Sequence, residues 1–424
     1  MRASSKPIAG VAVALALLLC ARAAQAIGSA KGDDASINAA GNVWLLGAYY
    51  HSWPWLPPLP TPPDDGIAAG TMRLILDGDL PRQVGYEANF YFELSRGPTS
   101  LGANTFLTPS SFNTPYRTPY LGWTFWSTGS VTGQMAVDRL RVHRSFGPVD
   151  ISIGRFPVNH SVTFLFTPND FFAPFSATTL NKSYKPGVDA LRVNVGLGAL
   201  SGLEVLGVLG SGKNGDPAWS SSAVTARLET VLAGFHGTII GGKLAARWIV
   251  GGTVQGDIKG IGLRAEGHFG MPDADGDGHI DGPLYGQLAA RVEHSWPWHN
   301  VTIGGEYAFF SDGAEAAADY LARAARLFPD ELPYLGRHYV GVNAGIDLIP
   351  ILNLGVVGLV NAGDGSGITT VSLVYNASNE VDLSLGMLAG WGWRPIASAG
   401  GTPALRSEFG ATPITAFFQT TVSF

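Results

Sequence analysis

The chain has 424 residues, a formal net charge of −6, 14% charged residues and 56 glycines. So few charges in so long a chain are atypical of a soluble enzyme, and the negative balance argues against a nucleic-acid partner. No stretch of low hydrophobicity divides the chain, and large β-barrels form single domains of this length, so one domain is expected.

The N-terminus has the features of a secretory signal peptide over residues 1–26. Basic residues precede an apolar run over 8–19, and the small-residue site Ala24-Gln25-Ala26 follows that run. We therefore expect the mature chain to begin at Ile27.

The single cysteine, Cys20, lies inside this leader. The exported chain is therefore expected to have no disulfide and no cysteine metal site. A lipoprotein would keep Cys20 as its anchor, but Leu19 occupies a position where such an anchor needs a small residue.

From residue 41 onward, apolar and polar residues alternate in segments of about ten residues, the length that a tilted barrel strand needs. The strongest candidate for a spanning helix, 346–360, is interrupted by Asp347, Pro350 and Asn353 and is better explained as two strands. About eighteen strands are expected, with sixteen as an alternative count. Their approximate ranges are 41–52, 70–80, 83–95, 133–146, 148–158, 187–198, 200–210, 220–231, 234–242, 244–256, 259–270, 284–295, 299–311, 335–348, 350–362, 366–377, 379–393 and 411–424.

The last of these strands alternates most clearly. One face is mainly apolar and carries Ile414, Ala416, Phe418, Thr420, Val422 and the terminal Phe424. The other face carries Thr415, Phe417, Gln419, Thr421 and Ser423. One face therefore suits lipid and the other suits water.

A β-sandwich would alternate in the same way, but three features favour a barrel in lipid. Charged residues occur in the middle of many strands, where a water-filled interior can solvate them. Aromatic residues gather at strand ends, and short turns alternate with longer connections. The long connections are 96–132, 159–186, 312–334 and 394–410.

A cleaved signal, this alternation of connections and a final strand ending in Phe424 resemble the porin-type outer-membrane β-barrels of Gram-negative bacteria. The resemblance implies an all-β fold, namely a transmembrane antiparallel β-barrel with short periplasmic turns and long extracellular loops. It also implies that the terminal aromatic residue forms part of the signal read by the barrel insertion machinery. Residues 27–40 would be a periplasmic N-terminal segment, and residues 41–424 the barrel.

The polar faces of the expected strands supply the candidate pore-lining residues. These are Glu87, Glu93, Arg139, Arg141, His143, Asp150, Arg192, Arg227, Glu229, Arg247, Arg264, Glu266, Arg291, Glu293 and Glu306. They could set a field along a diffusion path, or form cross-strand ion pairs within the wall.

An example of wall pairing within this set would be Arg264 and Glu266 on one strand with Arg291 and Glu293 on the neighbouring strand. The consecutive inward positions Arg139, Arg141 and His143 are the best candidate for a basic patch. Arg155 falls on the outward phase of its strand, so either a bulge turns it inward or it lies above the membrane.

The segment 150–156 followed by 167–172 is similar to porin segments in which an extracellular loop folds back towards the lumen. Loop 159–186 is therefore the candidate constriction, with Asp170 and Lys182 or Lys185 as its charged tips. The alternative is an ordinary surface loop.

The segment from Asp273 to Asp281 has the D-x-D-x-D-G spacing that places alternate carboxylates around a calcium ion. Its candidate ligands are Asp273, Asp275, Asp277, His279 and Asp281. An EF-hand has glutamate at loop position twelve, but Leu284 stands there, so binding would be weak and structural. The alternative is an acidic surface loop, and no cofactor is required.

The resemblance implies an outer-membrane channel for passive diffusion of small polar solutes or ions. The rival interpretation is a structural or partner-binding barrel, such as a sheath or a polymer-export pore. No nucleophile elbow, phosphate loop or zinc spacing occurs in the mature chain, so no enzyme activity is expected. Expected partners are membrane lipid, lipopolysaccharide, the insertion machinery, small polar solutes and, in a homo-oligomer, further copies of the chain.

Overall fold

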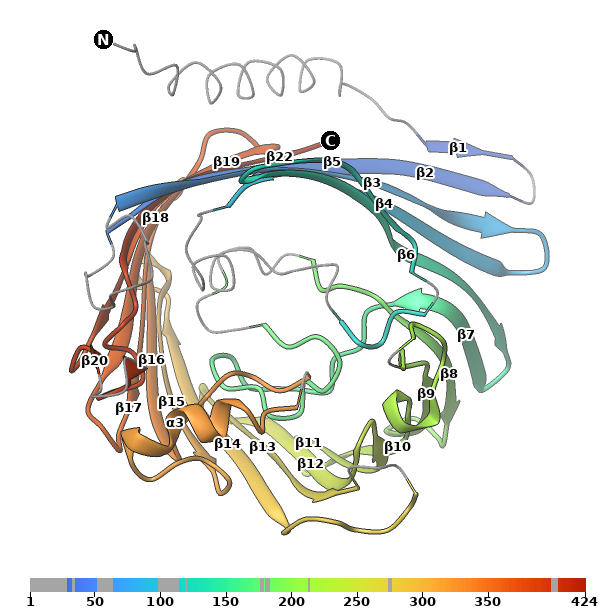
Figure 1. Ribbon diagram of the computed structural model, residues 1–424. Helices are drawn as coiled ribbons and strands as arrows, with labels where there is room; N and C mark the ends of the chain where they lie inside the picture. Colours follow the sequence, from blue (N-terminus) through green and yellow to red (C-terminus); the bar gives the residue numbers. More distant parts are fainter. Residues whose placement is uncertain are drawn as a thin grey trace.

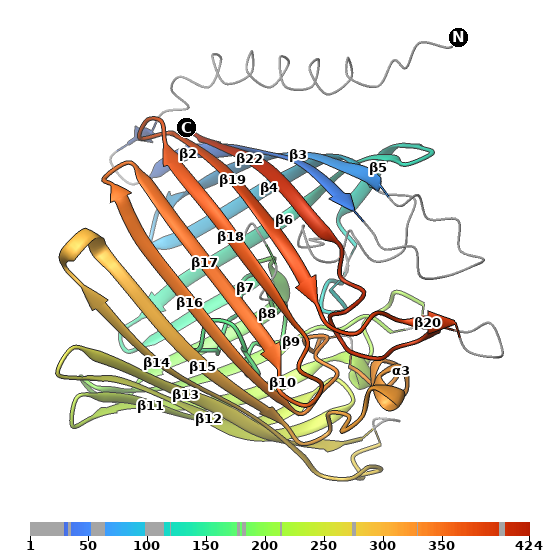
Figure 2. The same ribbon diagram turned by 90° about the vertical axis from the view of Figure 1, so that its left-hand side faces the viewer.

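A computed structural model describes residues 29–32, 35–51, 64–97, 114–118, 120–175, 179, 184–212, 214–273, 277–328, 330–397 and 403–424. Eighteen of the twenty strands in its main sheet form one closed antiparallel ring, because β22 pairs with both β19 and β2 (Figures 1 and 2). Among the described residues, no helix is long and apolar enough to cross a lipid bilayer.

The ring strands follow one another in chain order. They are β2 (Ser36–His51), β3 (Asp64–Leu80), β4 (Val84–Arg96), β6 (Val131–Phe146), β7 (Val149–Phe156), β8 (Val188–Gly196), β9 (Ser201–Val208), β10 (Ala223–Leu232), β11 (Phe235–Leu244), β12 (Arg247–Ile258), β13 (Ile261–Pro272), β14 (Tyr285–Trp296), β15 (Val301–Phe310), β16 (His338–Ile349), β17 (Leu352–Asn361), β18 (Gly367–Asn376), β19 (Val381–Trp391) and β22 (Ile414–Ser423).

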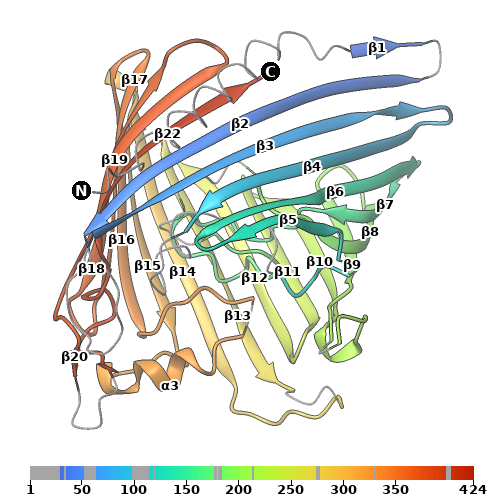
Figure 3. The same cartoon turned by 45° about the horizontal axis from the view of Figure 1, so that its top comes forward.

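Four further strands and four short helices complete the described structure. They are β1 (Ser29–Lys31), β5 (Gly122–Thr128), β20 (Ile396–Ala397), β21 (Pro403–Ala404), η1 (Trp219–Ser221), η2 (Trp298–Asn300), η3 (Ala317–Asp319) and α3 (Tyr320–Ala324). β1 pairs with the start of β2, and β5 forms a hairpin with β6 (Figure 3).

Each expected strand corresponds to one strand of the ring, so the larger of the two expected counts is confirmed. Some differences remain. β1, β5, β20 and β21 were not expected, and β3 begins at Asp64. β2 begins at Ser36, so residues 36–40 belong to the wall and not to the N-terminal segment. The connections also alternate less strictly than expected, because the link from β11 to β12 is a tight turn at Ala245, although it lies at the end that carries the long loops.

The two faces of the wall differ as the alternation predicts. On β22, Phe418 is 48% exposed and faces outward, whereas Phe417 is 2% exposed and faces the interior. The same contrast recurs on β12 and β13, where Val250 and Phe269 are exposed and Ile249 is buried. Exposed apolar side chains thus form a band around the ring, as expected for a wall surrounded by lipid.

The seam of the ring is closed by the last residue of the chain. Phe424 N–H donates to the Gly41 carbonyl at 2.9 Å, and Gly41 N–H donates to the Phe424 carbonyl at 2.8 Å. A Cβ at position 41 would lie 2.6 Å from the Phe424 ring, so only glycine allows this approach. We call the end near Phe424 the periplasmic end, as expected for both termini of such a barrel, and the opposite end the outer end.

Candidate functional site: an anchored loop inside the barrel

The segment that follows β7 enters the ring and does not cover it from outside (Figure 1). We call residues 157–175 the inward loop. Phe171 and Phe172 pack in one buried cluster with side chains of β8 to β12, whereas Leu165 and Phe166 pack in a second cluster with side chains of β14 to β19. The described part of loop 159–186 therefore lies inside the barrel, and its role as a constriction stays a prediction.

A glycine on the wall makes one of these contacts possible. A Cβ at Gly341 of β16 would lie 2.4 Å from Leu165 Cδ1 and 3.0 Å from the ring of Phe166. Because a larger residue would displace both side chains, Gly341 lets the inward loop reach the wall.

Glu266, at the middle of β13, holds the first turn of the inward loop. Its carboxylate accepts a hydrogen bond from Ser161 Oγ at 2.6 Å and from the backbone N–H groups of Val162, Thr163 (3.2 Å) and Asn169 (3.2 Å). The loop has no secondary structure of its own, so this side chain supplies the acceptors that its backbone needs.

Glu306, two strands away on β15, repeats this arrangement for the next three residues. It accepts from the N–H groups of Phe164 (3.1 Å), Leu165 (3.0 Å) and Phe166 (2.5 Å). Arg291 Nη1 lies 3.4 Å from the same carboxylate and offsets its charge. Glu266 and Glu306 were predicted to line an open pore, but both are buried anchors for the inward loop.

A third carboxylate binds the loop through a side chain. His160 Nε2 lies 2.8 Å from Glu204 Oε1 of β9, and Arg192 Nε lies 3.0 Å from the other oxygen of Glu204. The sequence analysis named Arg192 and did not name Glu204 or His160. The inward loop is thus held at three inward positions, on β9, β13 and β15.

Asp170 and Lys185, predicted as free charged tips of the constriction, form an ion pair with each other. Asp170 lies within the inward loop and Lys185 lies just before β8, and both side chains are largely buried. Neither is therefore a free tip facing solvent, and burial raises the pKa of Asp170 and lowers that of Lys185. Lys182 lies outside the described residues.

Arg247 was predicted to line the pore but lies buried at the outer end of β12. Its Nη1 is 2.9 Å from Asp330 Oδ1 in the outer loop 312–337, and Tyr116 OH donates to the other oxygen of Asp330 at 2.5 Å. This cluster ties two outer connections to the wall.

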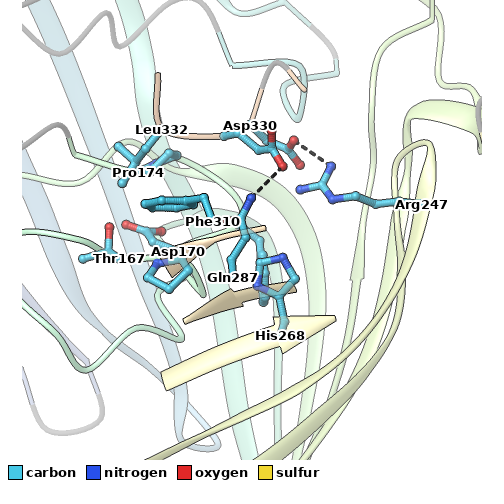
Figure 4. A pocket seen from close by; sticks show the side chains of 12 residues that line it. Thr167, Asp170, Pro174, Arg247, His268, Gln287, Phe310, Asp330 and Leu332 are labelled. Atoms are coloured by element: carbon cyan, nitrogen blue, oxygen red, sulfur yellow. Dashed lines mark hydrogen bonds and ion pairs between the residues drawn. The ribbon is translucent and has the colours of Figure 1, made fainter. Parts of the chain in front are cut away.

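Figure 4 shows a small cavity beside this cluster, between the inward loop and the wall. Thr167, Asp170, Arg247, His268 and Gln287 line it, and its volume of about 10 Å³ is close to that needed by one water molecule. Among the described residues, Thr167 Oγ1 and His268 Nε2 are buried without a hydrogen-bond partner. The cavity therefore fits a bridging water and is too small for a solute.

The other charged residues lie on the inner wall in pairs. Arg139 and Arg141 lie 3.2 Å and 3.5 Å from Glu87, Arg227 lies 3.1 Å from Glu229, and Arg264 lies 2.5 Å from Glu293. Arg291 also pairs with Glu293, at 2.8 Å. Wall pairing was thus expected correctly for Arg264, Arg291 and Glu293, but Glu266 does not take part.

The remaining predicted residues are less constrained. Glu93 accepts from Tyr91 OH at 2.7 Å, His143 covers Gly85, and Asp150 is exposed near the periplasmic end of β7. Arg141 keeps 30% of its side chain exposed and Glu229 keeps 38%, compared with 3% for Arg291. The exposed charges therefore lie on β6 and β10, and at Arg264 of β13, which keeps 36% of its side chain exposed.

A buried ion network that the sequence analysis missed lies where β6 and β7 separate. Asp138 is 0% exposed and pairs with Arg73 and Arg117, and Arg155 binds Asp189 through two hydrogen bonds of 2.7 and 2.8 Å. A register shift between β4 and β6 places Asp138 and Arg139 both inside, which breaks the alternation.

Arg155 keeps the outward position expected from the alternation, because it pairs directly with Leu140, whose side chain is exposed. Its side chain is buried because it binds Asp189, which lies opposite it on β8, and the Val137 carbonyl, 2.8 Å away. The ladders show no register shift at Arg155, so no bulge turns it inward, and its position above the membrane stays a prediction.

The acidic loop after β13 is described only in part, since Asp275 lies outside the described residues. Asp273 is buried and its Oδ2 accepts from Gly278 N–H at 3.2 Å, while Asp277 Oδ1 accepts from His279 N–H at 2.7 Å. Within the described ranges no group of three His, Cys, Asp or Glu side chains is arranged to hold a metal. Calcium binding at Asp273, Asp275, Asp277, His279 and Asp281 stays a prediction.

Comparison with known proteins identifies the fold. No protein-family model matches the chain, and no curated protein has a significantly similar sequence. Three solved structures align with 91% of this chain and 98% of their own length. They are a BenF-like porin from Pseudomonas fluorescens (TM-score 0.54, 9% identity), OccAB4 from Acinetobacter baumannii (0.53, 12%) and OpdK from Pseudomonas aeruginosa with vanillate (0.51, 11%).

At this level of identity the likeness concerns the fold. It agrees with the closed ring and the apolar outer band. A closed barrel with such a band satisfies every backbone group of its wall within lipid. The chain has the fold of a porin-type β-barrel of the bacterial outer membrane.

Proposed function

We propose that the protein is a channel through which small polar solutes or ions diffuse passively. The observation that carries this proposal is the inward loop, which three wall carboxylates hold across a ring of eighteen strands. A ring of this size encloses more space than wall side chains can fill. A loop fixed across it would narrow the passage to the size of a small solute.

Charges on the wall support a passage that contains water. Arg141, Arg227, Glu229 and Arg264 each keep more than a fifth of the side chain exposed, although all four face the interior. Because a partly exposed charge needs water or a polar solute as its neighbour, these residues would contact whatever moves through the barrel.

Arg139 and Arg141, which lie side by side on the inner face of β6, bear on which ions the channel would prefer. The two guanidinium groups share a single carboxylate, Glu87, and Arg141 keeps 30% of its side chain exposed. This excess of positive charge would favour small anions over cations.

Conductance of the refolded protein in planar lipid bilayers tests the proposal. We expect discrete single-channel steps, and larger steps when residues 163–174 are replaced by a short Gly-Ser linker. Reversal potentials in a salt gradient would report the expected anion preference. Absence of steps from protein whose barrel fold is verified would favour the rival, a structural or partner-binding barrel without free diffusion.

The protein would act without catalysis, lie among membrane lipid and lipopolysaccharide, and be inserted by the barrel assembly machinery. Association with further copies would leave each lumen intact, because the lumen is enclosed by a single chain.

A further inference from the structure

A groove marks the lipid-facing side of the wall at the periplasmic ends of β13, β14 and β15. It is an open hollow of about 530 Å³, lined by Ile261, Val292, Trp296, Ile303 and Gly305 and by the polar side chains of Lys259, Glu293 and His294. Ile261, Val292, Trp296 and Ile303 are all exposed large apolar residues. This groove is separate from the inward loop and faces away from the lumen.

The hollow is due to small residues on the outward face. A Cβ at Gly305 would meet no atom within 4 Å, so the space above this residue is open. Gly305 pairs with Val292, and the next outward pair towards the outer end is Tyr307 with Ala290. Larger side chains therefore stand on both sides of a gap that is one residue wide.

The periplasmic rim of the groove carries a cation on a fixed turn. Lys259 has a φ of 54° and, with Gly260 at 82°, forms the two-residue turn between β12 and β13. Asp257 Oδ1 accepts from Gly260 N–H at 2.8 Å, and the Gly260 carbonyl lies 2.6 Å from His294 Nδ1. Asp257 is engaged with the turn, and Lys259 has no ion pair within the described part of the chain.

An indole completes the rim. The Trp296 ring lies 4.4 Å from the His294 ring in an edge-on arrangement, so His294 links the Trp296 side chain to the turn that carries Lys259. Tryptophan and lysine at this level of a membrane protein lie among lipid headgroups, where the indole contacts the ester region and the ammonium attracts phosphate.

We propose that this groove binds one glycerophospholipid of the inner leaflet. One acyl chain would lie over Gly305 between Val292 and Ile303, and the phosphate would lie at the Lys259 ammonium. The lining fits hydrocarbon where Ile261, Val292 and Ile303 surround Gly305. The carboxylate of the lining, Glu293, is paired with Arg264 and Arg291, so the charge of Lys259 fits an anionic headgroup better than a zwitterionic one. The binding is expected to outlast exchange into detergent, unlike that of lipids elsewhere around the barrel.

Native mass spectrometry of the barrel, reconstituted with defined phosphatidylglycerol and phosphatidylethanolamine and then moved into detergent, tests this proposal. We expect the wild type to retain one phospholipid with a preference for phosphatidylglycerol. Gly305→Leu should lower the retained fraction by roughly tenfold, because the new side chain fills the groove without a clash. Lys259→Gln should remove the headgroup preference and leave weaker retention.

Gly358→Leu is the matched control, because Gly358 also lies on the outward face and also has open space around its Cβ position. This control should retain lipid as the wild type does. A wild type without retained phospholipid, or equal losses in Gly305→Leu and Gly358→Leu, would overturn the proposal. A dimer that disappears in Gly305→Leu, with no lipid bound in the wild type, would overturn it in favour of a second copy of the chain. The readout is lipid mass and not conductance, so it is independent of the channel proposal.

Discussion

The two sides of the inner wall use charge in different ways. On β13 to β15, Glu266 and Glu306 are buried, and their oxygens are occupied by backbone N–H groups of the inward loop. On β6 and β10, Arg141 and Arg227 remain partly exposed, and their partners Glu87 and Glu229 also lie on the wall, although Glu204 of the intervening β9 is a buried anchor of the loop. We call these the anchoring side and the basic side. Residue type and inward position are similar on both sides, so what separates structural from functional charge is whether a loop covers it.

The largest effect is expected on the anchoring side. Replacing Glu266 and Glu306 together by Ala leaves at least six loop N–H bonds without their acceptor, at a cost of about 1–3 kcal/mol per buried group that finds no water. We expect the inward loop to leave its position and single-channel conductance to rise by about two-fold or more. Bilayer recordings, with unfolding measured by the shift in electrophoretic mobility on heating, check this expectation.

Glu293→Gln is the control for that experiment. Glu293 lies on the same side and pairs with Arg264 and Arg291, but it does not contact the inward loop. A rise in conductance as large as that of the double variant would show that loss of charge, and not release of the loop, is responsible.

A smaller effect is expected on the basic side. Arg141→Gln and Arg227→Gln each remove a partly exposed guanidinium group. Neither leaves a buried carboxylate unpaired, because Glu87 keeps Arg139 as a partner and Glu229 is itself exposed. We expect the anion-over-cation permeability ratio to fall by roughly two-fold for each, with the unfolding temperature unchanged. Reversal potentials measure the ratio, and a change in the unfolding temperature without a change in the ratio would contradict the distinction between the two sides.

A buried carboxyl group outside the wall, that of Glu408, should make the stability of the outer loops depend on pH. Glu408, in the loop before β22, accepts from Tyr339 OH at 2.5 Å, Asn361 Nδ2 at 2.7 Å and Leu335 N–H at 2.9 Å. Burial, the largest cause, raises the pKa of Glu408 to about 7. The charge of nearby Asp364 also raises this pKa, whereas the three hydrogen bonds lower it.

Because the pKa of Glu408 is higher in the folded than in the unfolded state, folding takes up a proton in this range. The stability of the loop cluster should therefore rise as the pH falls from 8 towards 5. Hydrogen exchange at Leu335, corrected for its intrinsic pH dependence, should slow over this range in the wild type. In Glu408→Gln the exchange should be nearly independent of pH, and an unchanged slope in this variant would assign the effect to another group.

The smallest effect on conductance is expected from the acidic loop after β13, because it lies outside the charged inner wall. We propose weak calcium binding there, since Asp273 is buried and its Oδ1 has no hydrogen-bond partner among the described residues. Calorimetric titration with calcium should give a small heat for the wild type and none for Asp277→Ala. This substitution should leave the conductance unchanged. Flat traces for both proteins would leave only an acidic surface loop.

The wall could be predicted from the sequence because its rule is local. A period of two, repeated in segments of about ten residues, places Val250, Phe269 and Phe418 outside without reference to any other strand. β5 was missed because its residues are exposed and it pairs with β6 beside the main ring, so it has no single apolar face.

The site could not be predicted to the same degree because its contacts are distant in sequence. Glu266 binds Val162 across 104 positions and Glu306 binds Phe166 across 140, and the donors are backbone groups that any residue provides. Asp138 was missed for another reason, since one extra residue in β6 reverses the phase and no feature of the sequence marks it. The loop was expected inside the barrel on its resemblance to porin segments, but Glu266 and Glu306 were expected to line the pore or to pair within the wall, and not to bind the loop.

The bond between Gly41 and Phe424 joins the first wall strand to the last residue of the chain. Until β22 lies between β2 and β19, these two long strands keep unpaired edges. In lipid such edges would leave many N–H and C=O groups without partners. Loss of Phe424 alone would leave β22 paired on both sides but would remove two hydrogen bonds of the seam, so Phe424 secures a closure that the ten residues before it establish.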